Sequence, residues 1–189
     1  MFVKNVDLVA CAYSESDFPQ PLFGEICFVG RSNVGKSTLL NVLFNKKIAR
    51  ASKRPGKTRS INFYEVNRKY YFVDLPGYGY AEASKKERQR WALIIEKYFE
   101  NRAHQIKLSI LLIDCRLFLQ ESDKMFLEWS EYFQVPVTIV LSKVDKLNQS
   151  ELCRKVREFE KQNLEVIPYS AITKKGIDRI IEKITSALQ

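Results

Sequence analysis

Hydrophobic and polar positions along the chain form two kinds of segment. Short apolar runs, typical of strands buried on both faces of a sheet, lie at residues 25–29, 108–114, 135–141 and 165–168. Longer stretches with apolar side chains at helical spacing lie at residues 37–45, 84–102, 121–133, 149–162 and 175–188. Residues 61–66 and 69–74, separated by Asn67 and Arg68, predict a β-hairpin.

Strands that alternate with helices predict a three-layer α/β domain, in which helices cover both faces of a mostly parallel sheet. We expect six strands, one of them antiparallel, in a domain formed by residues 23–189. Residues 1–22 are predicted to be a leader that contains a strand at residues 6–12 and packs on the domain. Ligands of such folds bind at the carboxyl ends of the strands, so the loops that follow the strands are the candidate sites.

The loop after the first buried strand has the form of a phosphate-binding loop. Residues 30–37 read Gly-Arg-Ser-Asn-Val-Gly-Lys-Ser and lead into a predicted helix, as the pattern G-x-x-x-x-G-K-[ST] requires. Gly30 and Gly35 allow backbone angles that a side chain would block, so a polyphosphate can approach closely. Lys36 supplies a mobile positive charge, and Ser37 supplies a hydroxyl ligand for Mg2+.

Three further motifs follow later strands and favour a guanine nucleotide. In residues 74–77 (Asp-Leu-Pro-Gly), the acid can hold Mg2+ through water, and the amide of Gly77 can reach a terminal phosphate. Residues 142–145 (Ser-Lys-Val-Asp) end a buried strand, where Asp145 can accept hydrogen bonds from the N1–H and 2-amino groups that guanine has and adenine lacks. Residues 170–171 (Ser-Ala) can place a backbone N–H at the guanine O6.

Composition narrows the class of protein. A hydrophobic content of 46% argues against disorder, and no apolar run approaches the ~18 residues of a membrane-spanning helix. The first residues include an acid, Asp7, and no long apolar core, so we expect no secretory signal and a cytoplasmic location. The four cysteines are scattered without a C-x-x-C pair, so we expect reduced core residues and not a zinc or redox centre.

The net charge of +9 is concentrated in two short segments. Residues 46–59 carry seven basic side chains and no acid, and residues 85–90 carry four basic side chains and one acid. The remainder of the chain is close to neutral. A polyanionic partner is therefore expected to meet the protein at these two segments.

Together the motifs resemble the EngB group (also called YihA or YsxC) of the Era-like GTPases. The resemblance is carried by residues 30–37, 54–59 (Arg-Pro-Gly-Lys-Thr-Arg), 74–81 (Asp-Leu-Pro-Gly-Tyr-Gly-Tyr-Ala) and 143–145. It covers nearly the whole chain and implies the P-loop GTPase (Ras-like) fold. It also implies a monomeric, Mg2+-dependent GTPase that binds GTP and GDP and acts in assembly of the large ribosomal subunit, without a membrane partner. Ribosomal RNA and ribosomal proteins would be its partners, and proteins of this group are associated with normal cell division and septation.

The resemblance also implies the roles of individual residues. Ser37 and Thr58 are the expected magnesium ligands, and Lys36, Thr58 and Asn33 are the expected catalytic residues. The family usually has threonine where this chain has Ser142, and the hydroxyl group is retained. The expected nucleotide-binding residues are Gly30, Arg31, Ser32, Asn33, Val34, Gly35, Lys36, Ser37, Gly56, Lys57, Thr58, Arg59, Ser60, Asp74, Leu75, Pro76, Gly77, Ser142, Lys143, Val144, Asp145, Tyr169, Ser170 and Ala171.

Two positions bear on the rate of hydrolysis. In many GTPases a glutamine directly after the glycine of the Asp-x-x-Gly motif orients the attacking water, and here Tyr78 stands at that position. Tyrosine cannot place water in the same way, so we expect slow intrinsic hydrolysis. Related switches with asparagine at the position of Asn33 resemble potassium-activated enzymes, which makes K+ a candidate cofactor. A purely structural role for Asn33 in the loop is an equal alternative, and a comparison of hydrolysis in potassium and sodium buffers separates the two.

The charged segments coincide with the expected switch regions. Thr58 lies in the first segment, and the second segment follows Gly77, so we hypothesise that the bound nucleotide controls ribosomal RNA binding. Two other classes of protein share part of the pattern. A small-molecule kinase would need an acceptor site and would not explain residues 143–145, whereas a constitutive RNA-binding module would be expected to show an RNA-reading signature with paired stacking aromatics, which is not evident.

Overall fold

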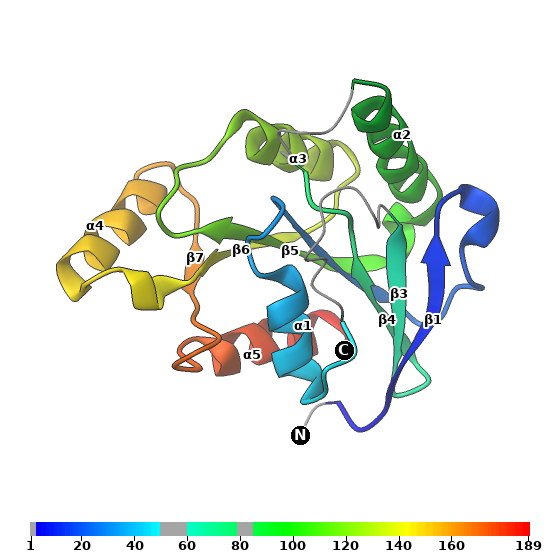
Figure 1. The fold of residues 1–189 in the computed structure, drawn as a ribbon, viewed down its shortest axis with the longest axis horizontal. Helices are drawn as coiled ribbons and strands as arrows, with labels where there is room; N and C mark the ends of the chain where they lie inside the picture. The colour runs from blue at the N-terminus through cyan, green and yellow to red at the C-terminus, as the bar shows by residue number, and fades with distance from the viewer. Residues whose placement is uncertain (1–2, 50–59, 79–84) are drawn as a thin grey trace.

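The structure, a computed structural model, describes residues 3–49, 60–78 and 85–189, and in this range a seven-stranded sheet lies between two layers of helices (Figure 1). The strands are β1 (Val6–Ala12), β2 (Glu25–Gly30), β3 (Ile61–Val66), β4 (Tyr70–Asp74), β5 (Ile106–Asp114), β6 (Val137–Ser142) and β7 (Val166–Pro168). The helices are α1 (Lys36–Phe44), α2 (Lys85–Arg102), α3 (Glu121–Tyr132), α4 (Gln149–Glu160) and α5 (Ile177–Ala187). Three 3-10 turns are η1 (Glu15–Asp17), η2 (Ala103–Gln105) and η3 (Val144–Lys146).

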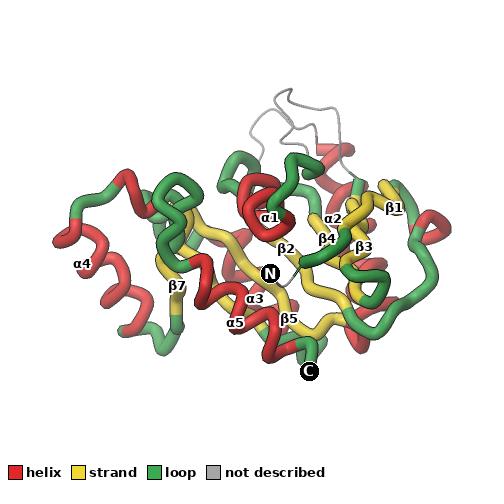
Figure 2. The backbone as a smooth tube through the Cα atoms, turned by 90° about the horizontal axis from the view of Figure 1, so that it is seen from below, coloured by secondary structure: helices red, strands yellow, loops and turns green. Residues whose placement is uncertain are grey.

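The order of strands across the sheet is β1-β3-β4-β2-β5-β6-β7, and Figure 2 shows it from β1 at one edge to β7, beside α4, at the other. Neighbouring strands from β4 to β7 are parallel, whereas β3 is antiparallel to both β4 and β1. The prediction of a mostly parallel sheet with one antiparallel strand is therefore confirmed. The sheet has seven strands and not six, because the leader strand β1 pairs with β3 from Val6 opposite Val66 to Ala12 opposite Ile61.

The two faces of the sheet have separate cores. One core includes buried side chains of α2, α3 and α4, such as Phe99, Phe126 and Phe159. The other core includes buried side chains of α1 and α5, such as Leu40 and Ile184. Because each parallel strand is covered on both faces, every residue of β2 is buried, as the apolar run of residues 26–29 predicts, and Glu25 is buried with them.

The elements begin and end close to their predicted positions. The hairpin turns at Asn67 and Arg68, which both have φ of 56°, a left-handed conformation, and the Lys69 amide donates to the Val66 carbonyl across the turn at 3.1 Å. Cys27 and Cys115 are buried as expected, but Cys11 and Cys153 are exposed because they face outward from β1 and α4; all four are free thiols. No helix of the described part of the chain is long and apolar enough to cross a membrane.

A buried ion pair joins the first core strand to the end of α2. Glu25 is fully buried, and its carboxylate accepts hydrogen bonds from Arg102 at 2.5 Å and from the Tyr98 hydroxyl at 2.6 Å. Burial raises the pKa of Glu25, and the two hydrogen bonds and the arginine charge oppose that shift. Arg102 also donates to the carbonyl of Pro19, so the same guanidinium holds the leader against the domain.

Candidate functional site

The phosphate-loop sequence has the backbone shape that an anion needs. Gly30, Asn33 and Gly35 have φ of 145°, 63° and 114°, and Gly35 is the N-cap of α1. At Gly30 a Cβ atom would lie 2.5 Å from the carbonyl oxygen of Leu112, so only glycine fits there. Among the described residues, the N–H groups of Gly35, Lys36 and Ser37 donate to no other group. The loop therefore presents unpaired donors at the positive end of a helix, where phosphate binds favourably.

Lys36 and Asp74 face each other at the carboxyl ends of neighbouring strands. The Lys36 amine is buried and donates to the Gly30 carbonyl at 3.2 Å. Burial lowers the pKa of Lys36, and the charge of Asp74 opposes that shift. Burial raises the pKa of Asp74 to about 6, against the stabilising effects of Lys36 and of a hydrogen bond with Ser37. Burial therefore destabilises the charged form of each group more than the opposite charge stabilises it. A charged ligand that binds beside the two groups would offset this cost.

The donor set at Asp74 fits a magnesium ion. Oδ1 of Asp74 is buried and has no hydrogen-bond partner among the described residues, and the Ser37 side chain helps to lower the pKa of the carboxyl. A hydroxyl and a carboxylate oxygen are ligands that Mg2+ takes together with waters and phosphate oxygens. When bound, the ion would neutralise charge on the phosphates. Thr58, the second expected ligand, lies outside the described residues.

The motif at residues 74–77 lies directly on the phosphate loop. The Ser32 amide donates to the carbonyl of Tyr78 at 2.9 Å, and the Ser32 hydroxyl donates to the carbonyl of Gly77 at 3.0 Å. A Cβ atom on Gly77 would lie 2.9 Å from the Ser32 backbone and 3.0 Å from the Lys36 amine. Leu75, which is buried, continues the β2–β4 pairing through a bond from its amide to Phe28. Residues 74–78 therefore close on the loop beside the lysine amine.

Tyr78 points away from the phosphate loop. Its side chain is buried, and its hydroxyl donates to Oδ1 of Asp123 in α3 at 2.5 Å. Burial, followed by the charge of Asp123, raises the pKa of Tyr78, so the phenol stays protonated. In this arrangement the proton of the tyrosine hydroxyl is directed at Asp123. Sequence reasoning missed Asp123, because a pairing between residues 78 and 123 leaves no local pattern.

The motif at the end of β6 is joined to the phosphate loop by two side chains. The Ser142 hydroxyl, which this chain has in place of the threonine usual in the family, donates to the Val34 carbonyl at 2.8 Å. The Lys143 amine donates to the Asn33 carbonyl at 2.7 Å and to Asp114 at 3.0 Å. These bonds hold the candidate base-binding loop at a fixed position relative to the candidate phosphate-binding loop.

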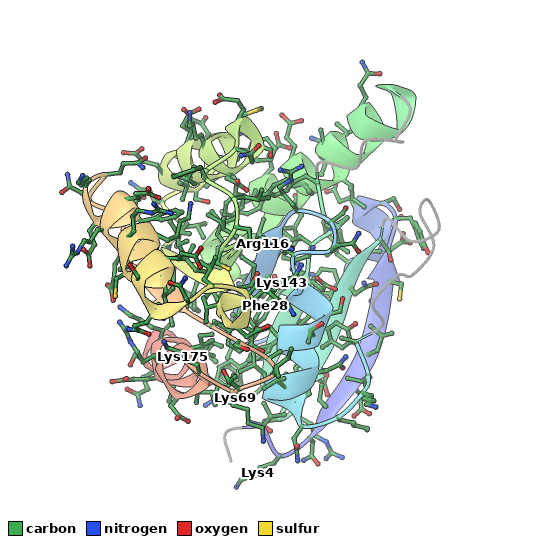
Figure 3. All side chains as sticks on the ribbon, turned by 60° about the vertical axis from the view of Figure 1, so that its left-hand side comes forward. Lys4, Phe28, Lys69, Arg116, Lys143 and Lys175 are labelled. Atoms are coloured by element: carbon green, nitrogen blue, oxygen red, sulfur yellow. The ribbon has the colours of Figure 1, made fainter. Side chains whose placement is uncertain are left out.

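Asp114 and Arg116 brace this lysine, and neither was predicted. The Arg116 guanidinium donates two hydrogen bonds to Asp114, at 2.7 and 2.8 Å, and Arg116 lies close to Lys143 (Figure 3). The pKa of Asp114 is well below its ordinary value because Arg116, and then Lys143, donate to its carboxylate. An available signal was the position of Asp114, an acid that directly ends a buried apolar run.

The position of Asp145 is suited to binding a nucleobase. It lies in η3, and its Oδ1 accepts a hydrogen bond from Ser170 at 2.7 Å. That bond holds the pKa of Asp145 below its ordinary value, so the carboxylate is ionised at neutral pH. The residues that precede Asp145 and Ser170 are buried and join the two loops, because the amide of Val144 donates to the Tyr169 carbonyl at 3.2 Å. The structure therefore brings Asp145 and residues 169–171 together, as the sequence predicts.

The remaining predicted residues lie at the edge of this group or outside it. Arg31 is half-buried and bridges to Tyr78 by its backbone. Ser60 is buried just before β3, where its hydroxyl donates to Asn62 at 2.9 Å. Pro76 is buried within the motif at residues 74–77. The predictions for Gly56, Lys57, Thr58 and Arg59 lie outside the described residues.

Comparison with known proteins agrees with this geometry. Residues 25–143 match the family described as "50S ribosome-binding GTPase". A probable GTP-binding protein EngB from Thermotoga petrophila is 52% identical over 194 aligned positions, which cover 100% of this chain and 99% of the relative. A crystal structure of a probable GTP-binding protein engB has a TM-score of 0.73 and 28% identity, and the match covers 87% of this chain and 98% of that one.

A more distant structure shares the fold. Era, crystallised in complex with MgGDPNP and nucleotides of 16S ribosomal RNA, matches with a TM-score of 0.66 and 23% identity over 89% of this chain and 57% of Era. The full-length similarity, the matched family and the geometry of the site agree. The chain belongs to the EngB family of P-loop GTPases, which bind guanine nucleotides and hydrolyse GTP.

Proposed function

We propose that the protein is a GTP-dependent switch in assembly of the large ribosomal subunit, and that this role makes it necessary for normal cell division and septation. The observation that carries the proposal is the membership of a family described as ribosome-binding GTPases, over residues 25–143. Work on ribosomal subunits would place the protein in the cytoplasm. Era, which has the same fold, forms a complex with 16S ribosomal RNA, so this architecture is compatible with an RNA partner.

We assign the nucleotide contacts as follows. The amides of residues 35–37 bind the phosphates, Lys36 reaches the outer phosphates, and Ser37 holds Mg2+ together with Thr58 and, through water, Asp74. Asp145 recognises guanine, and the backbone at residues 170–171 reaches its O6. The buried pair of Lys36 and Asp74 supports this assignment, because a phosphate and a cation would complete the charge balance of both groups.

Protons are expected to compete with Mg2+ at Asp74. Its carboxyl has a raised pKa of about 6, so it is ionised above that pH and protonated below it. The apparent affinity for Mg2+ should therefore fall by about tenfold for each pH unit below about 6. Magnesium titrations of nucleotide release at pH 5, 6 and 7.5 measure this effect. Asp74→Asn serves as the control, because any pH dependence of its Mg2+ affinity must come from the nucleotide phosphates. An equal pH dependence of Mg2+ affinity in both proteins would contradict the prediction.

Hydrolysis without an activating partner is expected to be slow. The Tyr78 side chain is turned toward α3, which supports the expectation that it does not orient water. The backbone of Asn33 is in the left-handed conformation, which asparagine adopts more readily than most residues. This supports the alternative in which Asn33 has a structural role in the loop. A potassium-binding role for Asn33 remains a hypothesis, and equal rates of hydrolysis in potassium and sodium buffers would remove it.

Co-sedimentation with large ribosomal subunits tests the proposed function. We expect the strongest binding with a non-hydrolysable GTP analogue and weaker binding with GDP or without nucleotide. Charge reversal of Lys53 and Arg54, which lie outside the described residues, should weaken subunit binding at least about tenfold and flatten its salt dependence. GTP affinity should change less than about twofold, because these side chains are assigned to RNA.

The matched control reverses two basic side chains elsewhere. Arg154 and Arg157 are exposed on α4, so the variant Arg154→Glu with Arg157→Glu makes the same change in net charge. It should bind subunits like the wild type. Binding that is insensitive to the nucleotide in all proteins would reject the switch, and equal losses in both double variants would reject a specific role for the first basic segment.

A further inference from the structure

Tyr78 is held at both of its ends. Its carbonyl accepts a hydrogen bond from the Ser32 amide in the phosphate loop at 2.9 Å, and its hydroxyl donates to Asp123 in α3 at 2.5 Å. The residue directly follows Gly77, whose backbone lies against the Lys36 amine. The beginning of the second switch is therefore attached to two different parts of the domain.

The acceptor in α3 is itself fixed. Asp123 is 1% exposed, and its second carboxylate oxygen accepts a hydrogen bond from the Gln120 amide at 2.8 Å, which caps the first turn of the helix. Two residues of the same helix, Phe126 and Trp129, pack against Phe99 of α2 with ring centroids 5.9 and 6.1 Å apart. The oxygen of Asp123 that does not cap the helix therefore accepts the hydrogen bond from Tyr78, and α3 holds this oxygen in a fixed position.

A cavity of about 220 Å³ lies behind the phosphate loop. Its lining includes residues 31–34 of the loop, Leu117 and Phe118 after β5, and Asp123 of α3. The phosphate loop and Asp123 thus border the same cavity. The hydrogen bond from Tyr78 to Asp123 therefore links the second switch to α3 directly and not through the phosphate loop.

We propose that Asp123 is a positioning residue for GTP hydrolysis: its hydrogen bond to the Tyr78 hydroxyl fixes the point at which the second switch begins, and so places the Gly77 backbone beside the phosphates. The bond between Ser32 and the Tyr78 carbonyl lies beside the phosphate site and can be exchanged when a triphosphate enters. The bond to Asp123 lies at the far end of the side chain and can persist. Tyr78 then acts as a pivot, with its ring anchored in α3 while the three preceding residues move.

The inference uses the GTPase activity of the family and does not depend on a ribosomal partner. A carboxylate that accepts from a buried hydroxyl forms a strong hydrogen bond, and its loss is costly because both groups are buried. The main consequence should appear in the chemical step, because small displacements of groups at a reacting phosphate have large effects on rate. Binding of GDP should be unaffected, since it requires no contact from Gly77.

A double-mutant cycle tests the proposal. The variants are Tyr78→Phe, Asp123→Ala and the two combined, and the measurement is single-turnover hydrolysis at saturating GTP and Mg2+ together with GDP affinity. Each single variant should hydrolyse GTP about tenfold more slowly, and the double variant should be no slower than the slower single variant, because all three lack the same bond. GDP affinity should stay within about twofold of wild type.

A control variant separates positioning from stability. Ser130→Ala removes a buried hydroxyl of α3 that bonds to the Phe126 carbonyl at 2.8 Å, so it should lower the melting temperature and leave the rate unchanged. A wild-type rate for Tyr78→Phe, or losses that multiply in the double variant, would overturn the proposal. If Asp123→Ala does not fold, Asp123→Asn replaces it in the cycle: combination with Tyr78→Phe should again add nothing to the loss, and multiplied losses would again overturn it.

Discussion

Replacing Asp145 with asparagine is expected to lower the affinity for GTP at least about a hundredfold and to create a preference for xanthosine triphosphate. The carboxylate can accept from both N1–H and the 2-amino group of guanine. An asparagine amide offers one acceptor and one donor, so its donor would face the 2-amino group and leave it unpaired. Xanthine carries a carbonyl in place of that amino group and would pair with both atoms of the amide.

Competition for a fluorescent GDP analogue by GTP, XTP and ATP measures the change. Asp178→Asn is the control, because Asp178 is an exposed acid in the first turn of α5 and its replacement removes the same charge. The control should retain the wild-type order of affinities. If Asp145→Asn binds GTP as tightly as the wild type, Asp145 does not read the base, and the assignment of guanine recognition to η3 is wrong.

Gly77→Ala is expected to reduce the rate of GTP hydrolysis at least about a hundredfold while GDP binding changes little. An added Cβ atom would lie 2.9 Å from the Ser32 backbone and 3.0 Å from the Lys36 amine. The backbone neighbour cannot move without displacing the phosphate loop, so residues 74–78 must shift away from it. The amide of Gly77 would then no longer reach a terminal phosphate.

The matched control for this variant is Gly24→Ala. A Cβ atom there would meet the Lys107 side chain at 2.8 Å, and a flexible lysine side chain can move aside. Gly24→Ala should therefore hydrolyse GTP at the wild-type rate, measured in the same single-turnover assay. Retention of that rate by Gly77→Ala would show that close approach of this segment to the phosphate loop is not needed for hydrolysis.

Local patterns were sufficient to predict most of the fold. Apolar runs at residues 25–29 and 108–114 identified buried parallel strands, and Asn67 with Arg68 identified the hairpin turn. The leader strand was located correctly, but its place in the sheet was not predicted. Strand pairing of β1 with β3 joins segments about fifty residues apart and depends on which edge is available, and alternation within residues 6–12 carries no information on that choice.

The residues of the candidate site also fall into those that a local pattern predicts and those that depend on contacts between distant segments. Residues assigned to the nucleotide through a motif, such as Lys36 and Asp145, are recognised because their spacing follows from the shape of the ligand. Asp114 and Asp123 act on other side chains, Lys143 and Tyr78, and their positions depend on how distant elements pack. No spacing rule connects such residues to the motif, so they become visible only in three dimensions.

The buried pair of Glu25 and Arg102 has a consequence for how the second switch can move. Arg102 ends α2, the helix that follows the expected second switch, and removal of either charge would leave the other buried without its opposite charge, at a cost of about 3–5 kcal/mol. The carboxyl end of α2 is therefore a stationary hinge point. We therefore expect any nucleotide-dependent movement of this helix to be greatest at residue 85 and to fade toward residue 102.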